Sequence, residues 1–210
     1  MAKKIAFIIF AGLCISIGLY PLIYFIIDPT FGLLNSKSDL LLNDGLWNIG
    51  FYAHISLGGL ALLIGWTQFS KRLRENNVSL HRNIGKVYLI SVLISGFSGL
   101  YIAYFATGGL VSTLGFSVLA IIWIYTTLRA FLEIKNQSIR KHKKYMIYSY
   151  AACFAAVTLR LWLPVLTALF QNFIIAYQIV SWLCWIPNMI VAFYIVKHEK
   201  LNKHFITSNS

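Results

Sequence analysis

Apolar residues occur along this chain in long runs that are interrupted only by short polar segments. A helix needs about 20 apolar residues to cross the hydrocarbon layer of a membrane. The runs therefore predict six spans, at about residues 5–27, 51–69, 87–106, 114–132, 145–168 and 174–196. Because no charge separates the last two runs, the turn between them is predicted at Gln171 and Asn172. We expect residues 1–210 to form a single integral membrane domain, an all-α bundle of six transmembrane helices.

Composition supports a lipid environment. Hydrophobic residues make up 59% of the chain and charged residues only 11%, whereas soluble domains carry about 25% charged residues. The apolar surface must therefore face lipid, and the bilayer is the first partner to expect. The formal charge of +12 could suggest nucleic-acid binding. However, the basic residues lie in short loops beside apolar runs, as in membrane proteins, and we expect no nucleic-acid partner.

The basic residues also predict the orientation of the chain. They gather before the first run, between the second and third, between the fourth and fifth, and after the sixth. These clusters are Lys3 and Lys4; Lys71, Arg72, Arg74, Arg82 and Lys86; Lys135, Arg140, Lys141, Lys143 and Lys144; and Lys197, Lys200 and Lys203. The intervening loops contain Asp28, Asp39 and Asp44, with Lys37 as their one basic residue. Since basic loops stay in the cytoplasm, the pattern predicts a multi-pass protein of the cytoplasmic membrane with both termini inside.

His54 and Arg160 are the first candidate site residues. His54 lies near the outer end of the second run, and Arg160 lies about 22 Å above Tyr145 if the fifth run is helical. The two are thus expected at similar depth. An arginine inside a span is costly and usually faces a cavity or a partner, yet no acidic residue is expected at this depth. One interpretation is a pocket that binds a carboxylate, a phosphate or a quinone oxygen. The other is an arginine that reaches the outer headgroups.

A second candidate site lies at the cytoplasmic side. His81 and His142 begin the third and fifth runs, and two imidazoles on facing helices can hold a b-type haem. Tyr88, Tyr145 and Gln68 lie at similar depth and could line such a cofactor site. This hypothesis requires the third and fifth spans to touch. The alternative is that each histidine simply caps a helix or contacts lipid phosphate. No metal-ion site is expected, because neither histidine has a carboxylate or cysteine nearby in the sequence.

Several of these residues together resemble a family pattern. The pattern comprises His54, Gly58, Gln68-Phe69, Arg72, His81-Arg82, Gly85, Tyr88, Arg140-x-His142, Tyr145-Met146, Ser149-Tyr150 and the run from Ala155 to Arg160. It resembles an uncharacterised, DUF-type family of predicted bacterial polytopic membrane proteins, over about residues 52–164. The family has no established activity. The resemblance therefore implies the helical bundle and marks His54, His81, His142 and Arg160, but it implies no reaction.

A more distant similarity is to the di-haem membrane cytochromes that pass electrons from ascorbate or to ferric iron. Those proteins have four histidines in two pairs. Here three histidines lie at membrane depth, and His54 has no histidine partner, so the analogy implies one bis-histidine haem at most.

Three functional hypotheses remain open at this point. The chain could be a haem- or quinone-linked redox protein, or it could bind or transport an anionic or amphipathic small molecule at His54 and Arg160. It could also be an accessory subunit of a larger membrane-protein complex. The sequence contains no glycine-rich phosphate loop, no HExxH and no GxSxG motif, so it assigns no catalytic residue.

Overall fold

The computed structural model describes residues 2–26 and 32–208, with side chains placed in 4–26 and 32–198. Within these residues the structure is helical and has no strand. Six segments are long and apolar enough to cross a membrane: Lys4–Ile26, Gly45–Phe69, Val78–Ala103, Leu110–Lys135, Ile139–Phe170 and Phe173–His198. The predicted all-α, six-span architecture is confirmed. Asp28 and the predicted end of the first span at residue 27 lie outside the described residues.

The second and third spans begin earlier than predicted, at Gly45 and Val78. Polar side chains fix both starts. Asp44 accepts hydrogen bonds from the backbone of residues 46 and 47, and Asn77 accepts one from residue 80. A hydropathy pattern reveals only the apolar part of a helix. The first turns of α4 and α6 precede that part, so the pattern did not predict them.

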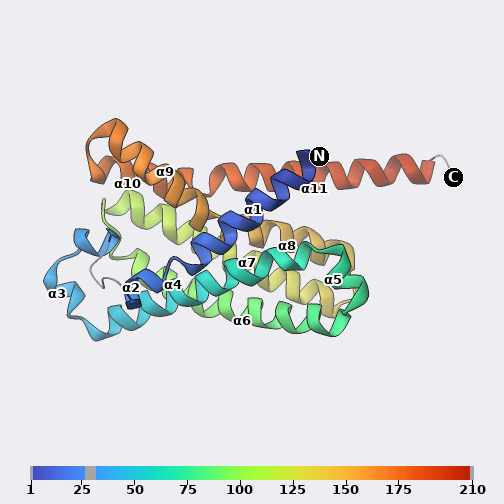
Figure 1. Cartoon of the computed structure of the whole chain (residues 1–210), viewed down its shortest axis with the longest axis horizontal. Coiled ribbons are helices and arrows are strands. Elements are labelled where there is room, and N and C mark those ends of the chain that lie inside the picture. Colours follow the sequence, from blue (N-terminus) through green and yellow to red (C-terminus); the bar gives the residue numbers. More distant parts are fainter. Residues whose placement is uncertain (1, 27–31, 209–210) are drawn as a thin grey trace.

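Four long helices form a closed ring at the centre of the molecule (Figure 1). They are α4 (Gly45–Gly65), α6 (Val78–Ala103), α7 (Leu110–Lys135) and α8 (Ile139–Cys153). Each packs on the next, and α8 closes the ring against α4. A short connection, η2 (Trp66–Phe69) and α5 (Lys71–Asn76), joins α4 to α6.

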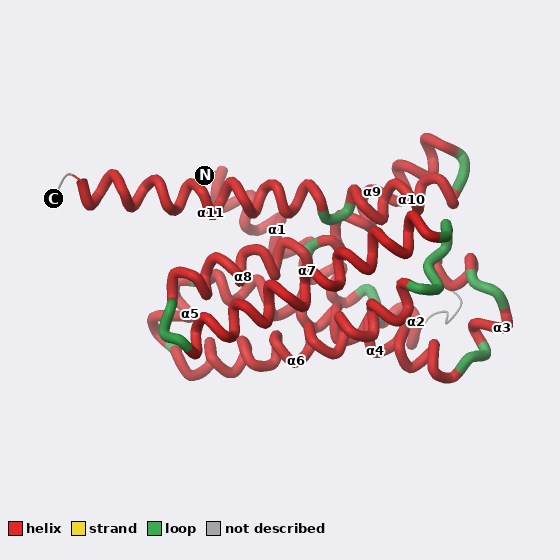
Figure 2. Tube along the Cα trace, turned by 180° about the vertical axis from the view of Figure 1, so that it is seen from behind, coloured by secondary structure: helices red, strands yellow, loops and turns green. Residues whose placement is uncertain are grey.

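The remaining helices surround this ring (Figures 1 and 2). The first span consists of α1 (Ala2–Leu19) and α2 (Leu22–Ile26), and α1 packs on α4 and α9. A hairpin of α9 (Ala155–Phe170) and α10 (Phe173–Leu183) packs on α7 through α10, and α11 (Ile186–Ser208) runs along α8 and beyond the ring. The loop after the first span contains the short helices η1 (Gly32–Ser36) and α3 (Asp39–Leu42).

Three of the six spans are broken helices. The first breaks at Tyr20–Pro21, the fifth at Phe154 and the sixth at Cys184–Trp185. Pro187 lies just after the break of the sixth span, in the first turn of α11. Backbone carbonyls that a break releases need new donors in a membrane. The Asn188 side chain supplies one by donating to the Cys184 carbonyl at 2.9 Å.

The turn between the last two spans lies where it was predicted. Helix α9 ends at Phe170, Gln171 adopts a left-handed conformation with φ of 49°, and the Asn172 side chain caps α10. Asparagine is a favoured N-cap residue because its side-chain oxygen accepts from the free backbone amides of the first turn.

Hydroxyl groups connect the helices of the ring inside the membrane. The Tyr88 hydroxyl on α6 lies 2.8 Å from the Ser149 hydroxyl on α8, which lies 2.6 Å from that of Thr127 on α7. The Tyr150 hydroxyl donates to the Leu62 carbonyl of α4 at 2.9 Å. The third and fifth spans therefore touch, through Tyr88 and Ser149.

Candidate ligand site

His54 and Arg160 line one cavity of about 60 Å³ between α1, α4 and α9. The structure therefore brings together the two residues that the sequence placed at similar depth. The cavity lies beside the break of the first span, because Pro21 also lines it. Its lining residues are Ile17, Pro21, His54, Ile55, Gly58, Gly59, Leu62, Ala156 and Arg160. All of them except His54 and Arg160 are apolar or glycine.

The His54 ring is held by the neighbouring helix. Its Nδ1 lies 2.8 Å from the backbone carbonyl oxygen of Ser95 on α6. Because a carbonyl can only accept, Nδ1 must carry the hydrogen of this bond. The Ser95 hydroxyl in turn donates to the His54 carbonyl at 2.8 Å. This pair of bonds fixes the ring, and no hydrogen bond to Nε2 exists among the residues that the structure describes.

Two glycines make room for this arrangement. A Cβ at Gly99 would lie 2.7 Å from His54 Nδ1, and a Cβ at Gly58 would lie 3.0 Å from the Ser95 hydroxyl. The small residues Ser91, Ser95 and Gly99 are spaced four apart on α6, and all three are buried. At Gly99 the absent side chain is what allows the His54 ring to reach its carbonyl.

Arg160 reaches the cavity from α9 without a carboxylate partner among the described residues. One terminal nitrogen donates to the Ala156 carbonyl at 3.0 Å, while the buried Nε has no hydrogen-bond partner. The guanidinium carbon lies 4.3 Å from the centre of the Tyr20 ring, at the break of the first span. A cation over a tyrosine face is attracted by the ring, but this contact leaves guanidinium donors for a ligand.

The inner candidate residues, His81, His142 and Gln68, lie at the end of the ring where η2 and α5 join α4 to α6. His142 Nδ1 lies 2.8 Å from the Ala130 carbonyl of α7, so its Nε2 is left to accept a ligand. His81 Nδ1 is buried without a partner, and so is the amide nitrogen of Gln68, whose side chain is buried beside Gly85. Imidazole nitrogens are the donors that axial haem ligation uses.

The two tyrosines predicted beside these histidines have partners of their own. Tyr88 is fully buried and bound to Ser149, and Trp123 donates to its hydroxyl at 3.5 Å. Tyr145 lies under the guanidinium of Arg129, at 5.5 Å from the ring centre. Tyr88 thus belongs to the hydroxyl network, whereas Tyr145 packs against Arg129.

Glu133 has the basic residues Arg129 and Lys135 close to it in the sequence. The buried carboxylate binds Arg129 at 2.8 Å, and its second neighbour is Lys141 at 3.9 Å. Lys135 instead lies over the ring of Phe131. Lys141 comes from the next helix, so its approach depends on how α7 and α8 pack, which sequence spacing alone does not reveal.

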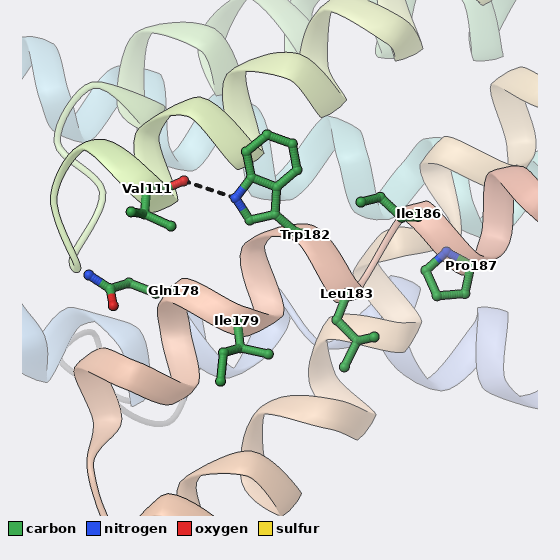
Figure 3. Close-up of a pocket in the computed structure, with 7 residues that line it drawn as sticks. All are labelled: Val111, Gln178, Ile179, Trp182, Leu183, Ile186 and Pro187. Carbon is green, nitrogen blue, oxygen red and sulfur yellow. Dashed lines mark hydrogen bonds between the residues drawn. The ribbon is translucent and has the colours of Figure 1, made fainter.

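A larger groove of about 540 Å³ lies on α10 near the break of the sixth span (Figure 3). It is lined by Val111, Gln178, Ile179, Trp182, Leu183, Ile186 and Pro187, and the Trp182 indole donates to the Val111 carbonyl at 3.2 Å. The groove is open and contains no charged residue. Its one side-chain amide, that of Gln178, already donates to the Gly108 carbonyl at 2.8 Å, and the rest of the lining offers mainly apolar contact.

Sequence reasoning missed Tyr20 and the role of Ser95 in the outer site. The signal for Tyr20 was Pro21, since a proline within a helix removes a backbone hydrogen bond and favours a break at that point. No sequence signal pairs Ser95 with His54, because the contact depends on the register between two helices.

A family model described as "Predicted membrane protein (DUF2306)" matches residues 51–196, well over half of the chain. The matched region contains the ring, the inner histidines, His54 and Arg160, and it starts after the first span. Comparisons with curated proteins and with solved structures gave no match.

Proposed function

The chain belongs to the DUF2306 family of predicted membrane proteins, and we propose that it binds the oxygen-bearing head group of a membrane-soluble small molecule between His54 and Arg160. The observation that carries this proposal is the Arg160 guanidinium, which lines a cavity and whose buried Nε has no hydrogen-bond partner among the described residues. Leaving such a cation without a partner is expensive within a membrane. A ligand oxygen would supply the missing acceptor.

The size and lining of the cavity support an amphipathic ligand. A volume of about 60 Å³ is about twice the share of one water molecule in the liquid, so it accommodates a carboxylate or the edge of a quinone but not a whole lipid. The rest of the molecule would lie against apolar side chains such as Ile17 and Ile55. A short polar head on an apolar tail matches both parts of the site.

Ligand-dependent thermal stabilisation tests this proposal. Purified protein in lipid nanodiscs would be heated with a decyl-tailed benzoquinone, with decanoate or with decyl phosphate. We expect at least one probe to raise the unfolding midpoint of the wild type and to leave Arg160→Met unaffected. Arg82→Met is the matched control, because it removes the same charge at an exposed position of α6 and should respond like the wild type. Equal stabilisation of wild type and Arg160→Met would overturn the proposal, and so would no stabilisation by any probe.

Haem ligation by His81 and His142 is a second candidate function. It is supported by the bond from His142 Nδ1 to the Ala130 carbonyl, because ligating histidines usually donate their second nitrogen in this way. A bound haem would supply one-electron transfer, and the protein would supply the two imidazoles. Protein from cells that make haem should then show a Soret band and sharp reduced α and β bands. The bands should disappear in His142→Ala and persist in His54→Ala, and a featureless wild-type spectrum would rule this candidate out.

We also propose that both termini lie in the cytoplasm and that the membrane is the cytoplasmic one. The alternation of basic loops supports this orientation. Reporter fusions after residue 210 and within residues 38–44 should report opposite sides of the membrane, with the terminal fusion inside. A terminal fusion that reports the outside would refute the orientation.

A further inference from the structure

The hydrogen bonds of His54 determine which kind of head group the cavity can accept. Nδ1 donates to the Ser95 carbonyl, so the hydrogen of a neutral imidazole lies on that side. A second positive charge beside the Arg160 guanidinium would be costly within the membrane. The ring is therefore neutral, and Nε2 is a hydrogen-bond acceptor that lacks a donor among the described residues.

Arg160 offers the opposite chemistry, because a guanidinium can only donate. The cavity therefore presents an acceptor from α4 and donors from α9. A quinone, an ether, an ionised carboxylate or a fully ionised phosphate has acceptors only. Each of these groups would satisfy Arg160 and leave His54 Nε2 facing a second acceptor.

We propose that the ligand carries a hydroxyl group, as a phenol or hydroquinone does, which donates to His54 Nε2 while its oxygen accepts from Arg160. This inference rests on the proposed function and adds the chemical class of the ligand. A single hydroxyl has one donor and two acceptor lone pairs, so it satisfies both side chains at once. The Ser95 backbone carbonyl fixes the His54 Nδ1 hydrogen at 2.8 Å, so Nε2 remains the acceptor that the ligand meets.

A matched pair of probes tests the role of the hydroxyl. 4-Decylphenol and 4-decylanisole have the same tail and ring, and they differ in that the ether cannot donate. Their dissociation constants for the protein in nanodiscs would be measured by titration calorimetry. We expect the phenol to bind about tenfold more tightly than the ether, the factor that one hydrogen bond of about 1.4 kcal/mol supplies.

Two variants assign that preference to His54. In His54→Leu the ratio of the two dissociation constants should fall to about one. In Ser95→Ala the ratio should remain, because the backbone carbonyl that fixes the His54 hydrogen is still present. Loss of the preference in Ser95→Ala, with its retention in His54→Leu, would contradict the assignment.

The outcomes separate this inference from the proposed function. Equal binding of phenol and ether to the wild type, with both lost in Arg160→Met, would overturn the hydroxyl inference and leave the Arg160 site intact. No binding of either probe, together with no stabilisation by the earlier probes, would overturn both. Because the wild-type comparison already decides the matter, a His54→Leu variant that fails to fold does not remove the test.

Discussion

His54 and Ser95 hold each other across the α4–α6 contact through two hydrogen bonds of 2.8 Å each. The imidazole donates to the serine carbonyl, and the serine hydroxyl donates to the histidine carbonyl. Reciprocal bonds of this kind fix both the rotation of the His54 imidazole and the register of α4 against α6. The candidate ligand site is thus built on the contact between α4 and α6, while Arg160 reaches it from α9, outside the four-helix ring.

Gly99→Ala should disturb the outer site from a helix that does not line the cavity. The new Cβ would lie 2.7 Å from His54 Nδ1, so the ring must move away from the Ser95 carbonyl. We expect a destabilisation of about 1–3 kcal/mol and the loss of ligand-dependent stabilisation. Gly85→Ala on the same helix is the control, because its Cβ would meet its nearest neighbour at an ordinary 3.4 Å. Similar unfolding midpoints for the two variants would contradict the close packing at His54.

Asn188→Ala should weaken the junction between the broken fifth and sixth spans. The Asn188 amide donates to the Cys184 carbonyl at 2.9 Å and to the Thr158 hydroxyl at 3.1 Å. The Thr158 hydroxyl itself donates to the same carbonyl. Removing the amide should cost about 0.5–2 kcal/mol in the free energy of unfolding, as measured by denaturant titration in detergent. An Asn188→Ala variant as stable as the wild type would show that the break does not depend on this clamp.

Tyr88→Phe should reveal the value of the buried hydroxyl network. The variant removes the partner of Ser149 at 2.8 Å and leaves the aromatic ring in place. We expect a loss of about 1 kcal/mol in the free energy of unfolding. Tyr125→Phe is the control, because Tyr125 is 55% exposed and should change the stability little. Equal effects of the two substitutions would argue against a stabilising role for the network.

Lys37 should make the stability of the protein depend on pH. The ammonium group donates to the Phe105 carbonyl at 2.5 Å and to the Thr107 hydroxyl at 3.1 Å, which ties the outer loop to the α6–α7 connection. Burial lowers the pKa of this lysine to about 8, whereas an unfolded lysine has a pKa near 10.4. Between these values the unfolded chain binds more protons than the folded chain. The free energy of unfolding should therefore rise with pH in that window, and below about pH 8 the cost of burying the charge is present in full.

Thermal unfolding between about pH 7 and pH 9.5 measures this dependence. The midpoint of the wild type should rise relative to that of Lys37→Met across the range. Lys71→Met removes a lysine whose side chain is 79% exposed, so it should follow the wild type. Parallel curves for wild type and Lys37→Met would contradict the lowered pKa.

The sequence predicted the spans well because the need for about 20 apolar residues is a strong constraint. It also predicted that His54 and Arg160 lie at one depth, because helical rise converts residue number into height. It could not predict which helices adjoin. Ser95 faces His54, and Lys141 approaches Glu133, only because of the packing between α4 and α6 and between α7 and α8. Pro187 follows the break at Cys184–Trp185 by two residues, whereas no proline or glycine lies near the break at Phe154.

The site at His81 and His142 also depends on helix contacts that the sequence does not reveal. Contact between the third and fifth spans was a condition of the haem hypothesis, and Tyr88 and Ser149 provide it. The bond from His142 to the Ala130 carbonyl joins α8 to α7 and could not be read from spacing.

Photolabelling tests the central claim most directly, because it distinguishes the cavity at His54 and Arg160 from the larger groove on α10. A decyl-tailed phenol with a photoreactive group on its ring would be crosslinked to the protein in nanodiscs, and the labelled residues would be mapped by mass spectrometry. Our account predicts labels on Ile17, Ile55 or Ala156 beside His54 and Arg160, with loss of the label in Arg160→Met. Labels on Ile179, Trp182 or Leu183 in the larger groove, unaffected by Arg160→Met, would contradict it.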